Sequence, residues 1–359
     1  MKKNFSLLLL AALLCAPLSV LSASDWNWTR AVIDAETSDR VHLRAGPSTG
    51  YASLGLYFTG TEVEFRAVPG SEWSEVTIGT EHGYMMSRFL TTAAAPRQPA
   101  ARINTAAQLR YTPNADSGSG LTLPAGTYVW LLGETNSRWY YVQAGLECGY
   151  IPEDCLTLAE GMSRPGYDEI LAQYAAAVRT RSSDGFWWVN GEGIMNYAGY
   201  GAELGYTLLD VDGNGVDELI VGERSQSDFS LGMIYNLYTL NNGYPRTAIN
   251  GWGRNAYYLC ADGQFLNEWS NGAGNSGWSV YGLENGQPVF RYGIVFDSEG
   301  PCGDDHPWYS VTAADRVPSA ANTVSESAAS KTIASLEGQI PAAHAVSLRQ
   351  DRAAILSRT

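Results

Sequence analysis

The chain has 359 residues, of which 37 are acidic and 23 basic, so its formal net charge at pH 7 is −14. Nucleic acid and anionic lipid surfaces are bound chiefly through Lys and Arg, and so acidic a chain is a poor partner for either. Both classes of function are therefore excluded as the main one, and the acidity indicates a protein kept in solution in an extracytoplasmic fluid.

Residues 1–23 predict a secretory signal peptide. Lys2 and Lys3 precede an apolar stretch from Phe5 to Leu14, and small residues follow. This stretch is too short for a permanent anchor, and no later stretch reaches the roughly 20 apolar residues that a transmembrane helix needs. We therefore expect no membrane insertion and a secreted or cell-surface location, which is the periplasm if the host has an outer membrane.

The chain has five cysteines, of which Cys15 lies in the leader. A lipidated Cys normally follows a small residue, whereas Cys15 follows two leucines, so a lipid anchor is disfavoured. The other four, in a chain that leaves the reducing cytosol, indicate two disulfides. Shared domains favour pairing Cys148 with Cys155 and Cys260 with Cys302. A zinc site made of all four thiolates is the alternative, but the close C-x-x-C pairs of such sites are missing.

An internal repeat follows the leader. The segment 31–91 is echoed by 102–158 at a constant offset of 66 residues, which indicates a tandem duplication. The matching pairs include Leu43 and Leu109, Arg44 and Arg110, Pro47 and Pro113, Gly60 and Gly126, Trp73 and Trp139, and Tyr84 and Tyr150. Short alternating strands with turns every eight to twelve residues predict a small all-β barrel for each copy. The Ala- and Pro-rich stretch 92–101 is interpreted as a linker.

The first copy resembles a bacterial SH3-type (SH3b) domain. The resemblance depends on "VHLRAGP" from Val41, "GTEV" from Gly60, the Trp at 73 and the closing "GY", although Met85 replaces the closing Val of the pattern. The second copy is a divergent member, because Thr112 replaces a Gly. The resemblance implies SH3-like barrels and binding of bacterial peptidoglycan or its peptide stems, with avidity from two modules.

Four aromatic residues are candidates for the ligand-binding surface of these modules. Trp73, Tyr84, Trp139 and Tyr150 offer flat apolar area together with a polar group. The alternative is that they form the barrel cores, and we favour it for the two Trp, because Trp is highly buried on average.

The region 163–312 has a different pattern. Tyr167, Ile170, Leu171, Tyr174 and Val178 recur at helical spacing and predict one amphipathic helix. Runs of β-branched and aromatic residues follow, punctuated by Asn-Gly and Asp-Gly, the strongest hairpin signals. We expect an α+β domain with an antiparallel meander, and then a low-complexity or weakly helical tail over 313–359.

A hairpin in this region carries a candidate metal site. Counting from Asp210, oxygen ligands fall at alternate positions, a set that suits Ca²⁺. The predicted ligands are Asp210, Asp212, Asn214, the carbonyl of Val216, and Glu218. The stretch resembles the strand-loop-strand calcium loops of FG-GAP repeats, and also an uncharacterised exported domain of the Firmicutes type. We expect one structural calcium ion; a hairpin whose side chains only cap their own backbone is the alternative.

Catalytic chemistry is weakly indicated. Cys260 or Cys302 with His306 would give a Cys-His pair, but nucleophile, base and orienting group are not all evident. We therefore expect a monomeric, secreted, non-enzymatic protein that holds a cell-envelope ligand, peptidoglycan or peptide, on tandem SH3b domains. The alternative is a cell-wall hydrolase with its catalytic site in 163–312.

Overall fold

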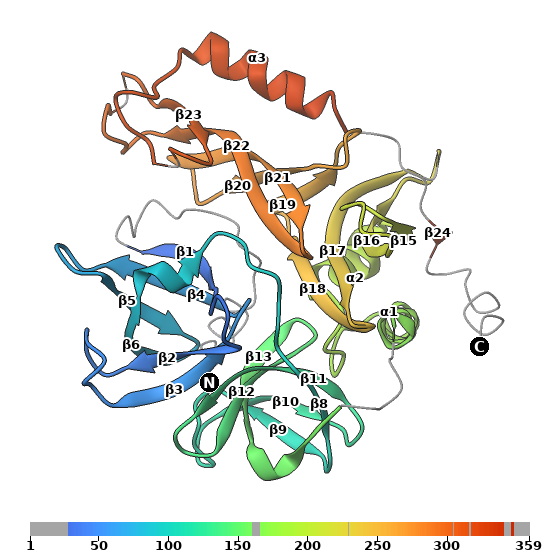
Figure 1. Cartoon of the computed structure of the whole chain (residues 1–359). Helices are drawn as coiled ribbons and strands as arrows, with labels where there is room; N and C mark the ends of the chain where they lie inside the picture. Colours follow the sequence, from blue (N-terminus) through green and yellow to red (C-terminus); the bar gives the residue numbers. More distant parts are fainter. Residues whose placement is uncertain are drawn as a thin grey trace, which may run out of the picture. The chain divides into compact units, whose positions relative to one another are not determined.

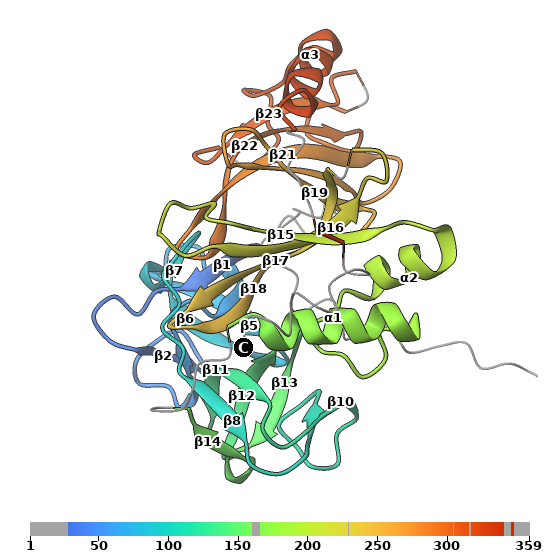
Figure 2. The same cartoon turned by 90° about the vertical axis from the view of Figure 1, so that its right-hand side faces the viewer.

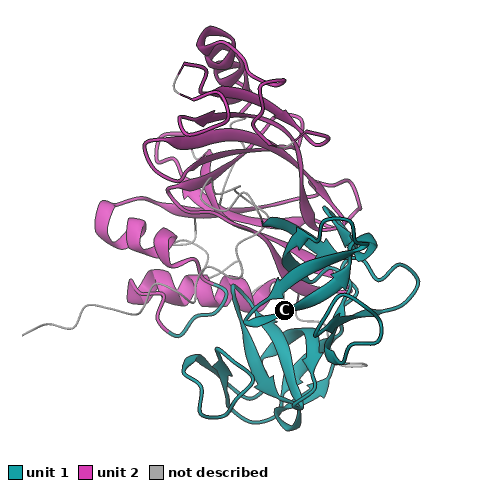
Figure 3. Cartoon of the chain, turned by 90° about the vertical axis from the view of Figure 1, so that its left-hand side faces the viewer, with its two compact units in different colours: residues 1–16, 27–164, 185–188 teal, residues 17–26, 165–184, 189–359 magenta. Residues whose placement is uncertain are grey.

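The computed structural model describes residues 28–159, 166–228, 230–303, 305–315, 317–340 and 346–347, and Figure 1 labels most of their helices and strands. The expected signal peptide therefore lies outside the described residues. The chain divides into two compact units (Figure 3): unit 1 holds the described residues up to 159 together with 185–188, and unit 2 holds the rest. No helix among the described residues is long and apolar enough to cross a membrane. The domain boundaries expected from the sequence stay a prediction.

Unit 1 is built from the two copies of the repeat. The first repeat has strands β1 (Thr29–Ile33), β2 (Arg40–Arg44), β3 (Ser53–Phe58), β4 (Glu62–Ala67), β5 (Trp73–Ile78), β6 (Glu81–Met86) and β7 (Leu90–Thr91). The second has β8 (Ala100–Ile103), β9 (Ala107–Arg110), β10 (Ser119–Leu123), β11 (Tyr128–Thr135), β12 (Trp139–Ala144), β13 (Glu147–Pro152) and β14 (Leu156–Leu158). Strands β12 and β13 lie 66 residues after β5 and β6, residue for residue, so the sequence repeat is also a structural one.

The expectation of two small SH3-like barrels is wrong. Each copy repeats the same antiparallel pairings, but β11 also pairs with β3, at Gly133 with Tyr57 and at Thr135 with Gly55. All strands of unit 1 therefore belong to one 14-stranded sheet. Glycine permits this pairing, because a Cβ on Gly133 would lie 2.3 Å from the Tyr57 ring.

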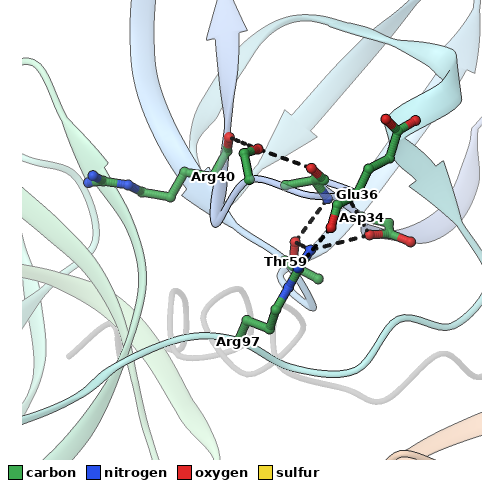
Figure 4. A network of polar contacts seen from close by, with 7 residues as sticks. Asp34, Glu36, Arg40, Thr59 and Arg97 are labelled. Atoms are coloured by element: carbon green, nitrogen blue, oxygen red, sulfur yellow. Dashed lines mark hydrogen bonds and ion pairs between the residues drawn. The ribbon is translucent and has the colours of Figure 1, made fainter.

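The stretch between the copies is fastened to the first one (Figure 4). The Arg97 guanidinium donates to the Glu36 carbonyl at 2.8 Å and to the Thr59 hydroxyl at 2.7 Å. The same hydroxyl accepts the Ala35 backbone N–H at 2.8 Å, and the Arg97 N–H donates to the Thr59 carbonyl at 3.0 Å. This part of the expected linker is thus held by directional hydrogen bonds rather than left as a free tether.

Unit 2 is an antiparallel β structure, and the expectation of an α+β domain is wrong. Its ten-stranded sheet has the order β23-β22-β21-β20-β19-β17-β16-β15-β24, and β18 pairs with β17. The strands are β15 (Leu204–Leu209), β16 (Glu218–Arg224), β17 (Leu231–Asn241), β18 (Tyr244–Asn250), β19 (Asn255–Leu259), β20 (Phe265–Ser270), β21 (Asn275–Glu284), β22 (Gln287–Asp297), β23 (Trp308–Thr312) and β24 (Val346–Ser347). Positive φ angles at Asn242 and Gly243, and at Asn285 and Gly286, confirm the predicted Asn-Gly hairpins.

Helices are few in the described part of unit 2: α1 (Asp168–Thr180), α2 (Gly191–Tyr200) and α3 (Glu326–Glu337). Figure 2 shows α1 beside α2, and their residues are in contact. Ile170, Leu171, Tyr174 and Val178 are buried on α1, which confirms the apolar face expected from their spacing. Helix α3 lies within the tail that was expected to be weakly helical.

A buried polar network holds the two helices to the sheet. The Tyr174 hydroxyl donates to the Asn236 amide oxygen and accepts the Asn190 backbone N–H at 3.1 Å. The Asn190 side chain caps α2 by accepting the Gly193 N–H at 3.0 Å, and it donates to the Asn250 oxygen at 2.8 Å. Such a satisfied network fixes one arrangement of helices on a sheet.

The predicted disulfide pairings are not formed, because Cys155, Cys260 and Cys302 are free thiols. Strand β13 is extended from Cys148 to Pro152, and Cys155 lies in the short 3-10 turn that follows it. Cys260 is buried with Leu266, and Cys302 packs near Trp269. Leu266 and Trp269 both lie on β20 and point to opposite faces of it. Cys260 and Cys302 are therefore not placed to bridge.

Candidate functional site

The first repeat presents a row of polar and aromatic side chains across four strands. Arg66 on β4 lies opposite Glu75 on β5, Glu75 lies opposite Tyr84 on β6, and Tyr84 lies opposite Arg44 on β2. Residues directly opposite each other in a sheet project from the same face. The strands alternate, so Val76 and Met85 point into the core while this row points outward.

Two further side chains join the row. His82 Nε2 lies 3.2 Å from Oε1 of Glu75. The other carboxylate oxygen, Oε2, accepts a hydrogen bond from Arg66 Nε at 2.9 Å. The Trp28 ring lies under the Arg66 guanidinium, 5.2 Å from its carbon, and the His82 ring is edge-on to both Trp28 and Tyr84. We call Trp28, Arg66, Glu75, His82 and Tyr84 the first-repeat face.

The first-repeat face is open to solvent. The side chains of His82 and Arg66 are 52% and 45% exposed, and Trp28 and Tyr84 are partly exposed. Exposed ion pairs of this kind contribute at most about 1 kcal/mol, so a ligand can rearrange them at little cost. The face combines flat aromatic area, one carboxylate, one guanidinium and an imidazole, which suits a ligand with amide and hydroxyl groups.

The structure separates the four predicted ligand-binding aromatics. Tyr84 lies on the first-repeat face, and Trp139 is half-buried at the start of β12. Trp73 is 7% exposed and Tyr150 is 1% exposed, so both rings are part of the core of unit 1. The other members of the face, Trp28, Arg66, Glu75 and His82, were not predicted from the sequence. The hairpin "EWSEVTIGTEHGYMM" carried a signal for two of them, because its register places Glu75 opposite Tyr84 and next to His82.

The acidic loop between β15 and β16 is the candidate metal centre. Asp210, Asp212 and Glu218 each offer a carboxylate oxygen, and these oxygens all lie within 4.8 Å of one another. The loop reverses through Gly213 and Gly215, whose φ angles of 72° and 84° favour glycine. Three predicted ligands are thus brought together by one tight turn.

Backbone N–H groups of the loop also bind these carboxylates. Asp210 accepts from Asn214 at 3.0 Å and from Gly215 at 2.9 Å, one bond on each oxygen. Asn214 is exposed, and its side-chain oxygen accepts the Val216 N–H at 2.7 Å. This is the hydrogen bonding expected of a self-capped turn, but a carboxylate has about four lone-pair sites, so each Asp retains acceptor capacity for a cation.

Glu218 distinguishes the loop from an ordinary turn. Its side chain is 0% exposed, and burial together with the nearby Asp212 and Asp210 raises the pKa of its carboxyl to about 7. Hydrogen bonds from the Val211 N–H at 2.9 Å and the Thr239 hydroxyl at 3.2 Å oppose that rise only in part. A buried carboxylate facing two others is stabilised by a divalent cation, so the donor set fits Ca²⁺.

No hydrogen bond joins Cys260 or Cys302 to His306 in the described part of the chain. Burial raises the pKa of the Cys260 thiol, which disfavours the nucleophilic thiolate. The Cys302 backbone N–H donates to the Tyr309 hydroxyl at 3.1 Å, while His306 is exposed on the following turn.

Comparisons with known proteins add little. No protein-family model and no curated protein matches the chain. Among solved structures it is similar to NlpC2 from Trichomonas vaginalis, with 16% identity over 61% of this chain and 91% of that one and a TM-score of 0.21. It is also similar to NlpC1 from the same organism, with 15% identity over 65% of this chain and 93% of that one and a TM-score of 0.21. An NlpC/P60 family protein from Bacillus cereus has 13% identity over 76% of this chain and 95% of that one, with a TM-score of 0.18. Likeness at these TM-scores carries no argument about function.

Proposed function

We propose that this protein is an extracytoplasmic, non-enzymatic binding protein that holds a cell-envelope ligand, peptidoglycan or peptide, on the first-repeat face. The observation that carries the proposal is the exposed cluster of Trp28, His82 and Tyr84 around the Arg66–Glu75 pair. The SH3b resemblance of the first repeat, which stays a prediction, supports the same class of ligand. The acidic loop of unit 2 would hold one structural Ca²⁺.

A sedimentation assay with purified bacterial cell walls tests the proposal. We expect the protein to sediment with the walls, and we expect Tyr84→Ala and Trp28→Ala to weaken that binding at unchanged melting temperature, because both side chains lie on the surface. Tyr200→Ala is the matched control, since Tyr200 is 81% exposed in unit 2. Equal binding by all three variants, or no binding by the wild type, would reject the proposal.

The calcium part has its own test. Calorimetry with Ca²⁺ on the whole chain should give one site, and Asp212→Ala should abolish the heat. Absence of heat with the wild type would identify the loop as a self-capped hairpin.

The alternative function is a cell-wall hydrolase acting through unit 2. The acidic loop is a poor catalytic centre for a polymer, because its carboxyl with the raised pKa, Glu218, is fully buried. Release of soluble muropeptides from walls by the purified protein, with and without Ca²⁺, decides between the two functions.

A further inference from the structure

The internal repeat permits a comparison of the first-repeat face with its counterpart in the second copy. The offset of 66 residues relates Arg66 to Leu132, Glu75 to Tyr141, His82 to Cys148 and Tyr84 to Tyr150. The backbone equivalence is close: Arg44 donates to the Tyr51 carbonyl at 2.9 Å, and its counterpart Arg110 donates to the Ser117 carbonyl at 2.7 Å. Tyr150 also lies opposite both Tyr141 and Arg110, as Tyr84 lies opposite Glu75 and Arg44. A bulge in β11 shifts the register, so that Gly133 and not Leu132 lies opposite Tyr141. We call Gly133, Tyr141 and Tyr150 the second-repeat face.

The two faces differ in chemistry and in burial. The first-repeat face has a guanidinium and a carboxylate where the second-repeat face has Gly133 and Tyr141; Gly133 is buried and Tyr141 is only 5% exposed. Burial and apolar substitution at the same positions are two independent signs that the second-repeat face is covered by protein.

The cover is the first repeat itself. Its Tyr57 ring packs where Gly133 leaves room, and its Gly79–Thr80 turn, which joins β5 to β6, lies on the two tyrosines. The Tyr150 hydroxyl accepts the Thr80 N–H at 3.4 Å and the Thr80 hydroxyl at 3.3 Å.

The fit at the turn requires glycine. Gly79 has a φ of +58°, and a Cβ there would lie 3.0 Å from the Tyr141 ring and from the Tyr150 hydroxyl. The Thr61 hydroxyl of the first repeat adds a bond to the Leu132 carbonyl at 2.8 Å. The contact therefore combines close packing, hydrogen bonds and the β3–β11 pairing.

We infer that the second-repeat face is an intramolecular docking site for the Gly79–Thr80 turn, and that the chain therefore binds its envelope ligand at one face only, that of the first repeat. The last clause rests on the proposed function. Avidity from two equivalent modules, which the sequence suggested, is replaced by a single open site on a rigid pair of repeats.

Hydroxyl-radical footprinting of the whole chain, with mass spectrometry and with or without purified cell walls, tests the inference. Without walls we expect Tyr84 to be oxidised severalfold faster than Tyr141 and Tyr150. With walls, protection should appear at Tyr84 alone. Oxidation of Tyr150 at the rate of Tyr84 would overturn the docking. Unchanged oxidation of Tyr84 in the presence of walls would reject the proposed function and leave the docking result intact.

A second measurement separates docking from binding. Tyr150→Phe and Thr80→Val each remove one partner of the hydrogen bond between the repeats, and their double variant should melt at a higher temperature than additivity predicts. Wall binding should be unchanged in Tyr150→Phe, because Tyr150 lies away from the open face. Additive melting shifts, or loss of wall binding in Tyr150→Phe at an unchanged melting temperature, would contradict the inference.

Discussion

Replacing Glu218 by Gln tests the acidic loop most sharply, because the effect of the substitution on stability should have opposite signs without and with calcium. Burial raises the pKa of the Glu218 carboxyl from 4.5 to about 7. The folded protein therefore binds more protons than the unfolded chain between these pH values, and its stability falls as the pH rises through that window. Above pH 7 the full cost of the buried carboxylate is present.

The magnitude follows from the pKa. A tenfold change in proton affinity corresponds to about 1.4 kcal/mol, so the rise of the pKa from 4.5 to about 7 corresponds to a cost of about 3 kcal/mol. Glutamine has nearly the same shape, accepts the Val211 N–H and carries no charge. In EDTA at pH 8, we expect Glu218→Gln to be more stable than the wild type by about this amount. At pH 5 the difference should be small, because the wild-type carboxyl is then largely protonated when folded.

Urea unfolding of the wild type and the variant at pH 5 and pH 8, each in EDTA and in millimolar Ca²⁺, measures the stability difference between the two proteins under these four conditions. In Ca²⁺ the wild type should gain more stability than the variant, since the Glu218 carboxylate binds the cation more strongly than the neutral amide of Gln does. Two results would refute the reasoning: a variant less stable than the wild type in EDTA at pH 8, or equal stabilisation of both proteins by Ca²⁺.

Three other predictions concern the fold and the open face. Gly79→Ala should cost about 1–2 kcal/mol more in urea unfolding than Gly70→Ala, because both have positive φ but only Gly79 abuts another side chain; equal costs would mean that the turn is not tightly docked. Tyr174→Phe should cost about 1–3 kcal/mol by leaving Asn236 and Asn190 unsatisfied, whereas Tyr200→Phe should be neutral; similar melting temperatures for both variants would contradict the network. Glu75→Gln should weaken wall binding with only a small change of the melting temperature, since its partners Arg66 and His82 are 45% and 52% exposed although Glu75 itself is 18% exposed; a large melting shift would instead make Glu75 a structural residue.

The sequence predicted what depends on local pattern. The 66-residue offset reappears as equal strand boundaries, the spacing of Ile170, Tyr174 and Val178 gives the buried side of α1, and both Asn-Gly dipeptides turn hairpins. The acidic loop also gathers as expected, because its ligands are neighbours along the chain.

Contacts between distant segments were not predictable in the same way. The pairing of β3 with β11 depends on Gly55 and Gly133. In the sequence each of them only interrupts an apolar strand pattern, which does not indicate pairing with a distant strand. Tyr84 and Tyr150 match in sequence, yet Tyr84 is partly exposed and Tyr150 is covered by a turn 70 residues earlier in the chain. The predicted disulfide pairings were wrong for a related reason, since cysteine spacing alone does not reveal how the chain runs between two cysteines.

The shared sheet of unit 1 also has a consequence for how the duplication persists. Deleting the second repeat would expose the edge of β3 and the apolar ring of Tyr57, while deleting the first would expose Tyr141 and Tyr150. A bare edge with aromatic side chains favours aggregation. The two halves, once copies of one module, now depend on each other for solubility, so that selection for a soluble protein preserves the second copy whether or not it ever meets a ligand.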